Sequence, residues 1–206
     1  QQALTLFRKL GIEKGIFLSL KHIGSIYDHW GQYDKAIETY QQGLAIARRL
    51  GEEQNIAIEL KHIGFIYWFL GRYDKAMENY QQALVLFRKI GNEKNIASIL
   101  GDIGMVYNSW GKSDKAMEHY QQALAIARRQ GHEDEIATVL SSIGGVYKSL
   151  GQYDKAMKNY QQALTLYRKL GREGRINTSL NAIGLGYVAW GKYDKAIENF
   201  QEGLAI

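Results

Sequence analysis

The feature that most constrains this chain is a repeat with a period of 40 residues. When the sequence is shifted by 40, glycine falls on glycine in three columns. The columns are Gly11, Gly51, Gly91, Gly131 and Gly171; Gly31, Gly71, Gly111, Gly151 and Gly191; and Gly24, Gly64, Gly104, Gly144 and Gly184. A period of about 20 to 50 residues is typical of solenoids, in which each unit buries its apolar face against its neighbours. We therefore expect a stack of similar units.

Each unit is predicted to be a pair of helices, near residues 13–30 and 34–50 in the first repeat. The apolar residues of both segments recur at helical spacing. They are Ile16, Leu20, Ile23, Tyr27 and Trp30, then Ala36, Ile37, Tyr40, Leu44 and Ala47. Asp34 is placed to cap the second helix. Because the chain has 22 glycines and no proline, we expect glycine in the left-handed conformation to end each helix.

Two further columns have local explanations. The Gly24 column falls in the middle of a helix, where glycine costs about 1 kcal/mol relative to alanine. We expect that the second helix approaches closely there. Paired cations such as Arg48 and Arg49 recur at the equivalent positions near residues 8, 88, 128 and 168, in the last turn of the second helix of a pair, where the helix dipole favours positive charge.

These residues resemble the tetratricopeptide family. The family's pattern of a large apolar residue, an apolar-Gly pair and a Tyr, followed by Ala and an aromatic residue, is filled in all five repeats. In the first repeat the six positions are Leu20, Ile23, Gly24, Tyr27, Ala36 and Tyr40, and Phe200 is the only change of aromatic residue. Two departures are the replacement of the family's proline by Arg48 and its equivalents, and a period of 40 in place of about 34. The longer period is similar to Leu-Gly-Asn adaptors and bacterial signalling arrays, although Ser25 and its equivalents replace the Asn of that signature.

The resemblance implies an all-α fold, a right-handed α-solenoid or superhelix of stacked antiparallel helix-turn-helix repeats. We expect a single array over residues 1–206, with half of a second helix at 1–10. The repeats fall at about 11–50, 51–90, 91–130, 131–170 and 171–206, the last one truncated. Since both ends cut through a repeat, the sequence predicts a fragment of a longer array.

Several function classes are not indicated. The chain has no cysteine, and its five histidines form no His-Glu-x-x-His pair, so we expect no metal, no cofactor and no catalytic residue. No apolar run approaches the roughly 18 residues that span a membrane, and a cytoplasmic location is the default. The net charge of +5 slightly favours acidic partners. Nucleic acid is not expected, because the helix ends explain the paired cations.

The resemblance implies a concave groove lined by the first helix of each pair. Groove positions vary strongly between repeats, whereas framework positions barely change, which favours a face shaped for binding over free surface drift. The candidate residues are Lys21, His22, Ser25, His29, Lys61, His62, Phe65, Trp68, Phe69, Asp102, Met105 and Asn108. The expected function is a scaffold that binds a peptide or protein segment.

The strongest signal lies in the first two repeats. Phe65, Trp68 and Phe69 fall at i, i+3 and i+4, so we expect one contiguous patch. With Lys21 and Lys61 nearby, it suits an acidic segment that carries a bulky apolar residue. One alternative is that Trp68 or Phe69 packs against an adjacent first helix. Alternative functions are a structural array that stacks head to tail, and the sensing or regulatory arm of a larger signalling protein.

Overall fold

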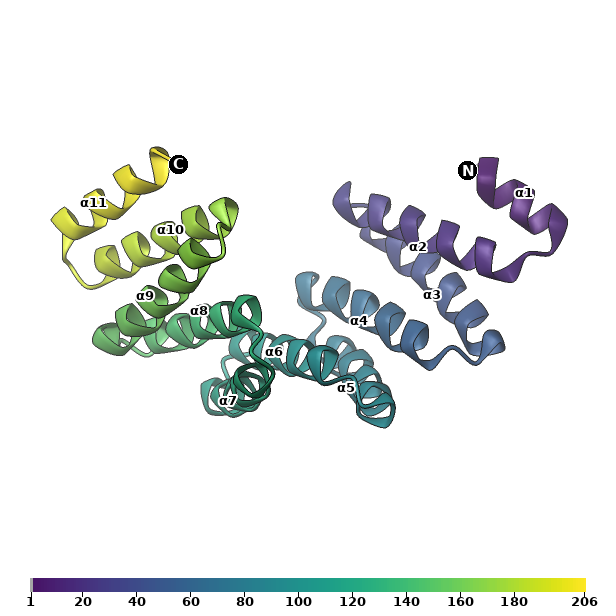
Figure 1. The fold of residues 1–206 in the computed structure, drawn as a ribbon, viewed down its shortest axis with the longest axis horizontal. Coiled ribbons are helices and arrows are strands. Elements are labelled where there is room, and N and C mark those ends of the chain that lie inside the picture. The colour runs from purple at the N-terminus through teal and green to yellow at the C-terminus, as the bar shows by residue number, and fades with distance from the viewer. Residues whose placement is uncertain (1) are drawn as a thin grey trace. The chain divides into compact units, whose positions relative to one another are not determined.

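The computed structural model describes residues 2–206, and throughout this range the regular structure is helical (Figure 1). The helices are α1 (Gln2–Leu10), α2 (Glu13–His29), α3 (Tyr33–Leu50), α4 (Glu53–Phe69), α5 (Tyr73–Ile90), α6 (Glu93–Ser109), α7 (Ser113–Gln130), α8 (Glu133–Ser149), α9 (Tyr153–Lys169), α10 (Glu173–Ala189) and α11 (Tyr193–Leu204). The first pair, α2 and α3, begins and ends within one residue of the predicted boundaries.

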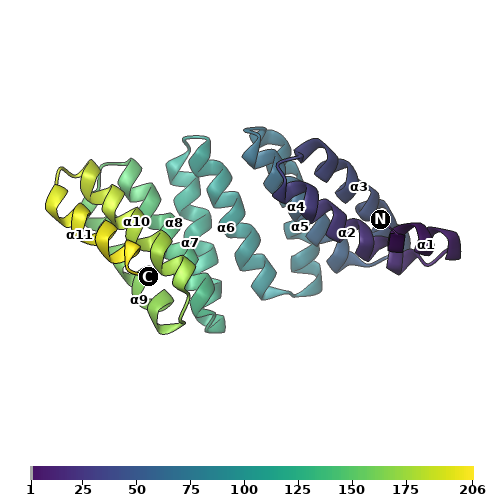
Figure 2. The same ribbon diagram turned by 90° about the horizontal axis from the view of Figure 1, so that it is seen from above.

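The chain divides into two compact units, Gln1–Asp102 and Ile103–Ile206, with the boundary inside α6. In the first unit α2 packs against α3 and α4 against α5, and in the second α8 packs against α9 and α10 against α11. Figures 1 and 2 show that within each unit the even-numbered helices form one layer and the odd-numbered helices the other. The prediction of an all-α stack of antiparallel helix pairs is confirmed.

Glycine ends the helices, as the composition predicts. Gly31 has φ of 70° and Gly51 has φ of 66°, and the other eight glycines of the two turn columns have similar positive values. At the end of α3 the amide of Gly51 donates to the carbonyl of Arg48 (3.2 Å), and the amide of Glu52 donates to that of Ala47 (3.0 Å). These bonds satisfy carbonyls that the helix leaves open, and they require a residue that tolerates positive φ.

The predicted cap is wrong. Helix α3 begins at Tyr33, its N-cap residue is Gln32, and no side chain donates or accepts a capping hydrogen bond there. Asp34 lies inside the first turn. Its carboxylate therefore acts on the helix dipole and does not cap an amide.

The glycines in the middle of the first helices each face an aromatic ring. A Cβ atom on Gly24 would come within 2.7 Å of Tyr40, and one on Gly64 within 2.9 Å of Tyr80. Each of the five pairs repeats this contact, with Phe200 on Gly184 in the last one. The close approach expected from the sequence is thus made by a buried ring of the second helix.

The paired cations have a second explanation besides the helix dipole. Arg49 Nη2 lies 2.8 Å from Glu13 Oε1, so the end of α3 is bound to the start of α2. Lys89 pairs with Glu53 and Lys169 with Glu133 in the same way. Such exposed pairs contribute only about 0 to 1 kcal/mol each, but they give these cations an acidic partner within the protein.

Candidate protein-binding site

The first helices of consecutive repeats lie side by side within the first unit. Lys61 Nζ on α4 donates to Ser98 Oγ on α6 (2.6 Å) and lies 3.3 Å from Asp102 Oδ2. Lys21 on α2 is close enough for its charge to act on Glu59 and His62 of α4. The fold therefore brings predicted site residues from α2, α4 and the middle of α6 onto one face.

The predicted residues differ in exposure. On α2, His22, Ser25 and His29 are exposed and Lys21 is partly buried. The remaining residues of the first unit divide into two groups: Phe65 and Phe69 are exposed, whereas Lys61, His62, Trp68 and Asp102 are partly buried. Met105 and Asn108 are partly buried and belong to the second unit.

Four aromatic side chains form what we call the aromatic patch: Tyr33, Phe65, Trp68 and Phe69. Ring centroids are 5.5 Å apart for Phe65 and Trp68, and 6.5 Å apart for Trp68 and Phe69. Tyr33, at the start of α3, lies 4.9 Å from Phe69. The three residues of α4 are contiguous, as expected. Tyr33 was missed because it belongs to a second helix, which sequence reasoning assigned to the other layer.

The charge of this face is smaller than the sequence suggests. Lys61 and Asp102 form an ion pair, so two residues expected to contact a ligand contact each other. Burial raises the pKa of Asp102, and the charge of Lys61 opposes this rise. Lys21, whose charge acts on Glu59, is therefore the lysine of this face that forms no ion pair within residues 2–206.

A buried polar cluster, consisting of Lys21, Tyr40, Glu59 and His62, lies beside this face. Glu59 has no exposed surface, and neither of its carboxylate oxygens has a hydrogen-bond partner. Burial raises the pKa of Glu59 to about 7, with Lys21 opposing. His62 stacks on Tyr40, with ring centroids 5.0 Å apart. Burial, followed by the charges of Lys61 and Lys21, lowers the pKa of His62 to about 4.

Sequence reasoning missed Glu59, although its column carried a signal. The equivalent residues are small or apolar. They are Ser19 one repeat earlier, and Ile99, Val139 and Ser179 one, two and three repeats later. Opposite Glu59 lies Gly43, where an added Cβ would come within 3.4 Å of Oε2. Ala83, Ala123 and Ala163 hold three equivalent positions of Gly43, and Gly203 holds the fourth. The contact between the first and second repeats thus combines a glycine on α3 with a carboxylate on α4.

Phe65 leaves a buried hydroxyl without a partner. In the first repeat, Ser25 places a hydroxyl within reach of Tyr40. In the second repeat, the equivalent of Ser25 is Phe65, and the hydroxyl of Tyr80 has no hydrogen-bond partner. An unsatisfied buried polar group costs about 1 to 3 kcal/mol. Phe65 is therefore not the residue that the fold alone would favour at this position.

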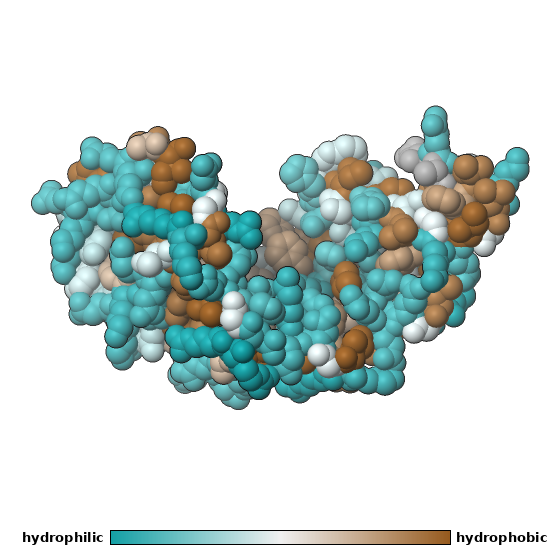
Figure 3. Space-filling model, viewed as in Figure 1, coloured by the Kyte–Doolittle hydropathy of each residue, from teal (hydrophilic) through white to brown (hydrophobic). Residues whose placement is uncertain are grey.

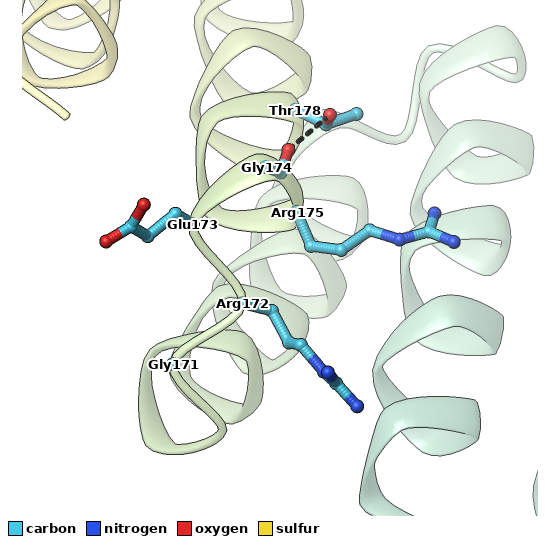
Figure 4. A pocket seen from close by; sticks show the side chains of 6 residues that line it. All are labelled: Gly171, Arg172, Glu173, Gly174, Arg175 and Thr178. Atoms are coloured by element: carbon cyan, nitrogen blue, oxygen red, sulfur yellow. Dashed lines mark hydrogen bonds between the residues drawn. The ribbon is translucent and has the colours of Figure 1, made fainter.

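A depression of about 560 Å³ lies elsewhere, at the start of α10 in the second unit. Figure 4 shows Arg172 and Arg175 pointing to the same side, while Glu173 points away and Thr178 donates to the carbonyl of Gly174. Arg172 Nε is 3.3 Å from Asp134 Oδ1. None of the predicted site residues lines this depression, and a helix start with one paired arginine does not define a ligand, so we assign it no role.

Residues 2–206 hold neither a metal-binding cluster nor a membrane-spanning helix. No group of three or more His, Asp or Glu side chains in this range is arranged to hold a metal ion. Within the same part of the chain, no helix has the length and apolar character needed to cross a membrane.

The stacked helix pairs define a class of helical-repeat proteins that act in general as scaffolds for protein interactions. The sequence matches a family model described as tetratricopeptide repeat over residues 55–129 and 135–206, and a second model of the same description over residues 22–49. These matches span more than half of the chain, so it belongs to the tetratricopeptide repeat family.

Solved structures share this fold at low identity. BtubC from P. vanneervenii is 21% identical, with a TM-score of 0.81 over 99% of this chain and 86% of that protein. A Rap protein complexed with Competence and Sporulation Factor is 20% identical, with a TM-score of 0.83 over 92% of this chain, which spans only 53% of that protein. A glutamine-to-methionine variant of the nearly identical TPR-like repeats of a putative kinesin light chain from Podosopora anserina is 19% identical, with a TM-score of 0.71 over 91% of this chain and 92% of that chain. No curated protein matches the sequence significantly.

Proposed function

We propose that this protein is an interaction scaffold whose first unit binds a peptide or protein segment on the face made by α2 and α4. The observation that carries this proposal is the exposure of the aromatic patch. Phe65 is 40% exposed and Phe69 is 57% exposed, and both contact Trp68. Large aromatic side chains that are exposed together commonly mark a protein-binding surface. The unsatisfied hydroxyl of Tyr80 supports this proposal, because Phe65 stands where a polar side chain would satisfy that hydroxyl.

The partner proposed is a segment with a bulky apolar anchor and nearby acidic residues. The anchor fits the aromatic patch. The acidic preference rests on α2, where Lys21 is joined by the exposed His22 and His29. Lys61 contributes less than its sequence position indicates, since Asp102 neutralises it.

The comparison with the Rap protein supports a binding role of this kind. That protein was solved in complex with Competence and Sporulation Factor, and it has the same fold over most of this chain. Because this chain spans 53% of the Rap protein, the same comparison also favours the alternative that these repeats are the sensing or regulatory arm of a larger signalling protein.

The first prediction concerns Trp68, the central member of the aromatic patch. Trp68→Ala is expected to weaken binding of a partner identified by pull-down by about 2 kcal/mol or more, a loss of about 30-fold. Isothermal titration calorimetry measures the affinity, and circular dichroism checks that the helicity is unchanged.

Two variants serve as controls for this measurement. Phe65→Ser should also weaken binding but raise the free energy of unfolding, because it places a hydroxyl next to the unsatisfied hydroxyl of Tyr80, as Ser25 does next to Tyr40. Val188→Ala, on α10 of the second unit, should keep the affinity. Unchanged binding by Trp68→Ala, or a larger loss in Val188→Ala, would place the site elsewhere.

A second candidate function, head-to-tail self-association, is favoured by exposed apolar residues on α1 and α11. Leu6 and Leu10 are exposed on α1, and Tyr193 and Ile197 are exposed on α11. Figure 3 shows hydrophobic residues at the surface around α1. If these faces join neighbouring molecules, sedimentation equilibrium should show oligomers that grow with concentration, and the double variant Leu6→Glu, Ile197→Glu should be monomeric. A monomer at every concentration of the unmodified protein rules this candidate out.

A further inference from the structure

A second depression, of about 440 Å³, lies at the turn edge of the first unit. Its walls are the turn after α2, the first residues of α3, and Leu70 and Arg72, which follow α4. Tyr33 forms part of the wall and also contacts Phe69 at 4.9 Å. The depression is therefore continuous with the aromatic patch.

The depression exists because the chain has leucine where other repeats have tryptophan. The column at the end of the first helices reads Trp30, Leu70, Trp110, Leu150 and Trp190. In the second unit, Trp190 stacks on Tyr153 with ring centroids 5.9 Å apart and an interplanar angle of 24°. Tyr33 and Leu70 hold the equivalent positions in the first unit. Since the leucine side chain is smaller than an indole, space remains beside Tyr33.

The replacement of tryptophan by Leu70 also leaves Arg72 without an indole ring beside it. Lys192 lies 3.2 Å from the ring centroid of Trp190, and Lys112 lies 3.3 Å from that of Trp110. Arg72 is the equivalent residue, but it follows Leu70 and has no indole to cover. Among residues 2–206, no acidic side chain forms an ion pair with Arg72.

The other charged residues of the depression do not compete for this role. Lys35 donates to Gln32 Oε1 (3.0 Å) and lies over the ring of Tyr27. Asp34 is exposed and adds one negative charge. Arg72 is therefore the cation of this depression whose side chain has no hydrogen-bond, ion-pair or ring partner among the described residues, and it lies next to an apolar surface made by Tyr33 and Leu70.

We propose that this depression binds an apolar side chain together with an adjacent carboxylate of the partner segment. The apolar side chain packs between Tyr33 and Leu70, and the carboxylate accepts hydrogen bonds from the guanidinium of Arg72. A planar guanidinium binds a carboxylate through two parallel hydrogen bonds, which fixes both position and direction. The inference rests on the proposed function, because the segment that crosses the aromatic patch is the one that reaches this depression.

The carboxylate could belong to the C-terminus of the segment or to an acidic side chain, and three small probes separate these sources. They are N-acetylphenylalanine, N-acetylphenylalanine amide, and N-acetyl-aspartyl-phenylalanine amide. Each is titrated into the ¹⁵N-labelled full chain while the amide signals of residues 31–35 and 70–72 are followed by NMR. Shifts with the free acid alone indicate a terminal carboxylate, and shifts with the aspartyl probe but not the simple amide indicate a side-chain carboxylate. Equal shifts with all three probes, or none with any, overturn the proposal.

Leu70→Trp tests the apolar half of the site. It is expected to weaken probe binding at least 10-fold, because the indole fills the depression as Trp190 does beside Tyr153. In the second unit, Tyr153 and Lys192 accommodate the indole of Trp190 beside Ala189, where the first unit has Phe69. Leu150→Trp is the matched control, since it makes the same exchange in the second unit and should leave binding unchanged.

Arg72→Gln tests the charged half and does not depend on how the tryptophan variant folds. It should abolish the difference between the acidic probe and the simple amide. Trp68→Ala distinguishes this inference from the proposed function, because it should weaken binding of the partner segment and leave binding of the probes unchanged. If Leu70→Trp and Arg72→Gln both bind the probes like the unmodified protein, this inference fails while the proposed function stands.

Discussion

Replacing Glu59 with isoleucine is expected to stabilise the protein, by up to about 3 kcal/mol at pH 8. Glu59 is wholly buried, and neither carboxylate oxygen has a hydrogen-bond partner. Isoleucine has a similar volume, and Ile99 is fully buried at the equivalent position one repeat later. The substitution therefore removes an unfavourable buried carboxylate and puts in a side chain that this fold already accepts.

The gain should depend on pH in a direction that the pKa of Glu59 sets. Its pKa is about 7 in the folded protein, above the ordinary value of 4.5. Between these values the folded state holds a proton that the unfolded chain has lost, so the stability associated with this proton is lost as the pH rises from about 4.5 to 7. The advantage of Glu59→Ile should therefore be smallest near pH 4.5 and largest above pH 7.

His62 makes the stability depend on pH in the opposite direction. Its pKa falls from the ordinary value of 6.5 to about 4 on folding, so the unfolded chain binds the extra proton and stability falls as the pH drops through this range. In the unmodified protein, the pH dependences of stability due to Glu59 and to His62 offset each other. Glu59→Ile should expose the slope of His62, and the variant should lose stability from pH 6.5 towards pH 4. The groups that face this pair are Lys21 on α2, Tyr40 on α3 and Lys61 on α4.

Urea denaturation of the full chain between pH 4.5 and 8.5 measures this difference. Glu59→Gln should show the same pH dependence as Glu59→Ile, because both remove the titrating group. Glu38→Gln, on the exposed side of α3, is the matched control and should show no such trend. An equal gain for Glu59→Ile at pH 5 and pH 8 would mean that Glu59 does not take up a proton on folding.

Two glycines of α6, three residues apart, should respond to alanine in opposite directions. A Cβ on Gly104 would come within 2.8 Å of the Tyr120 ring, whereas a Cβ on Gly101 would meet nothing within 4 Å. Alanine favours a helix over glycine by about 1 kcal/mol, but displacing a packed ring costs about 1 to 3 kcal/mol. Gly104→Ala should therefore lower the free energy of unfolding by about 1 to 2 kcal/mol, and Gly101→Ala should raise it by up to about 1 kcal/mol.

Thermal and urea unfolding of both variants checks this pair. Gly64→Ala adds a second test of the crowded position, since its Cβ would come within 2.9 Å of Tyr80. Shifts of the same sign for Gly101→Ala and Gly104→Ala would show that helix propensity alone decides these positions.

The helices could be predicted from the sequence because the pattern of each helix of a pair occurs five times along the chain. Glycine columns mark the turns, and the ring of Tyr40 and its equivalents explains the third column, so repetition removes the ambiguity of any single segment. Asp34 was misplaced because a cap and a first-turn residue differ by only two positions, and both positions favour an acidic side chain.

The site was only partly predictable. Phe65, Trp68 and Phe69 share one helix, so their spacing alone determines that they meet. The pairing of Lys61 with Asp102 depends on how far α4 and α6 are displaced along each other, which a helical pattern does not give. Glu59 was overlooked because its spacing places it beside the apolar stripe, and only comparison with Ile99 and Val139 marks it as unusual.

The contact of Tyr40 with Gly24 has a consequence for how such an array changes in length. Both partners belong to one helix pair, and so do Tyr80 with Gly64 and each later equivalent. Inserting or deleting a block of 40 residues therefore leaves every one of these contacts whole, and the new junction joins surfaces of a kind that already meet elsewhere in the chain. Recombination between repeats that share these contacts can thus alter the number of helix pairs, and the number of faces that they present, without repacking any helix pair.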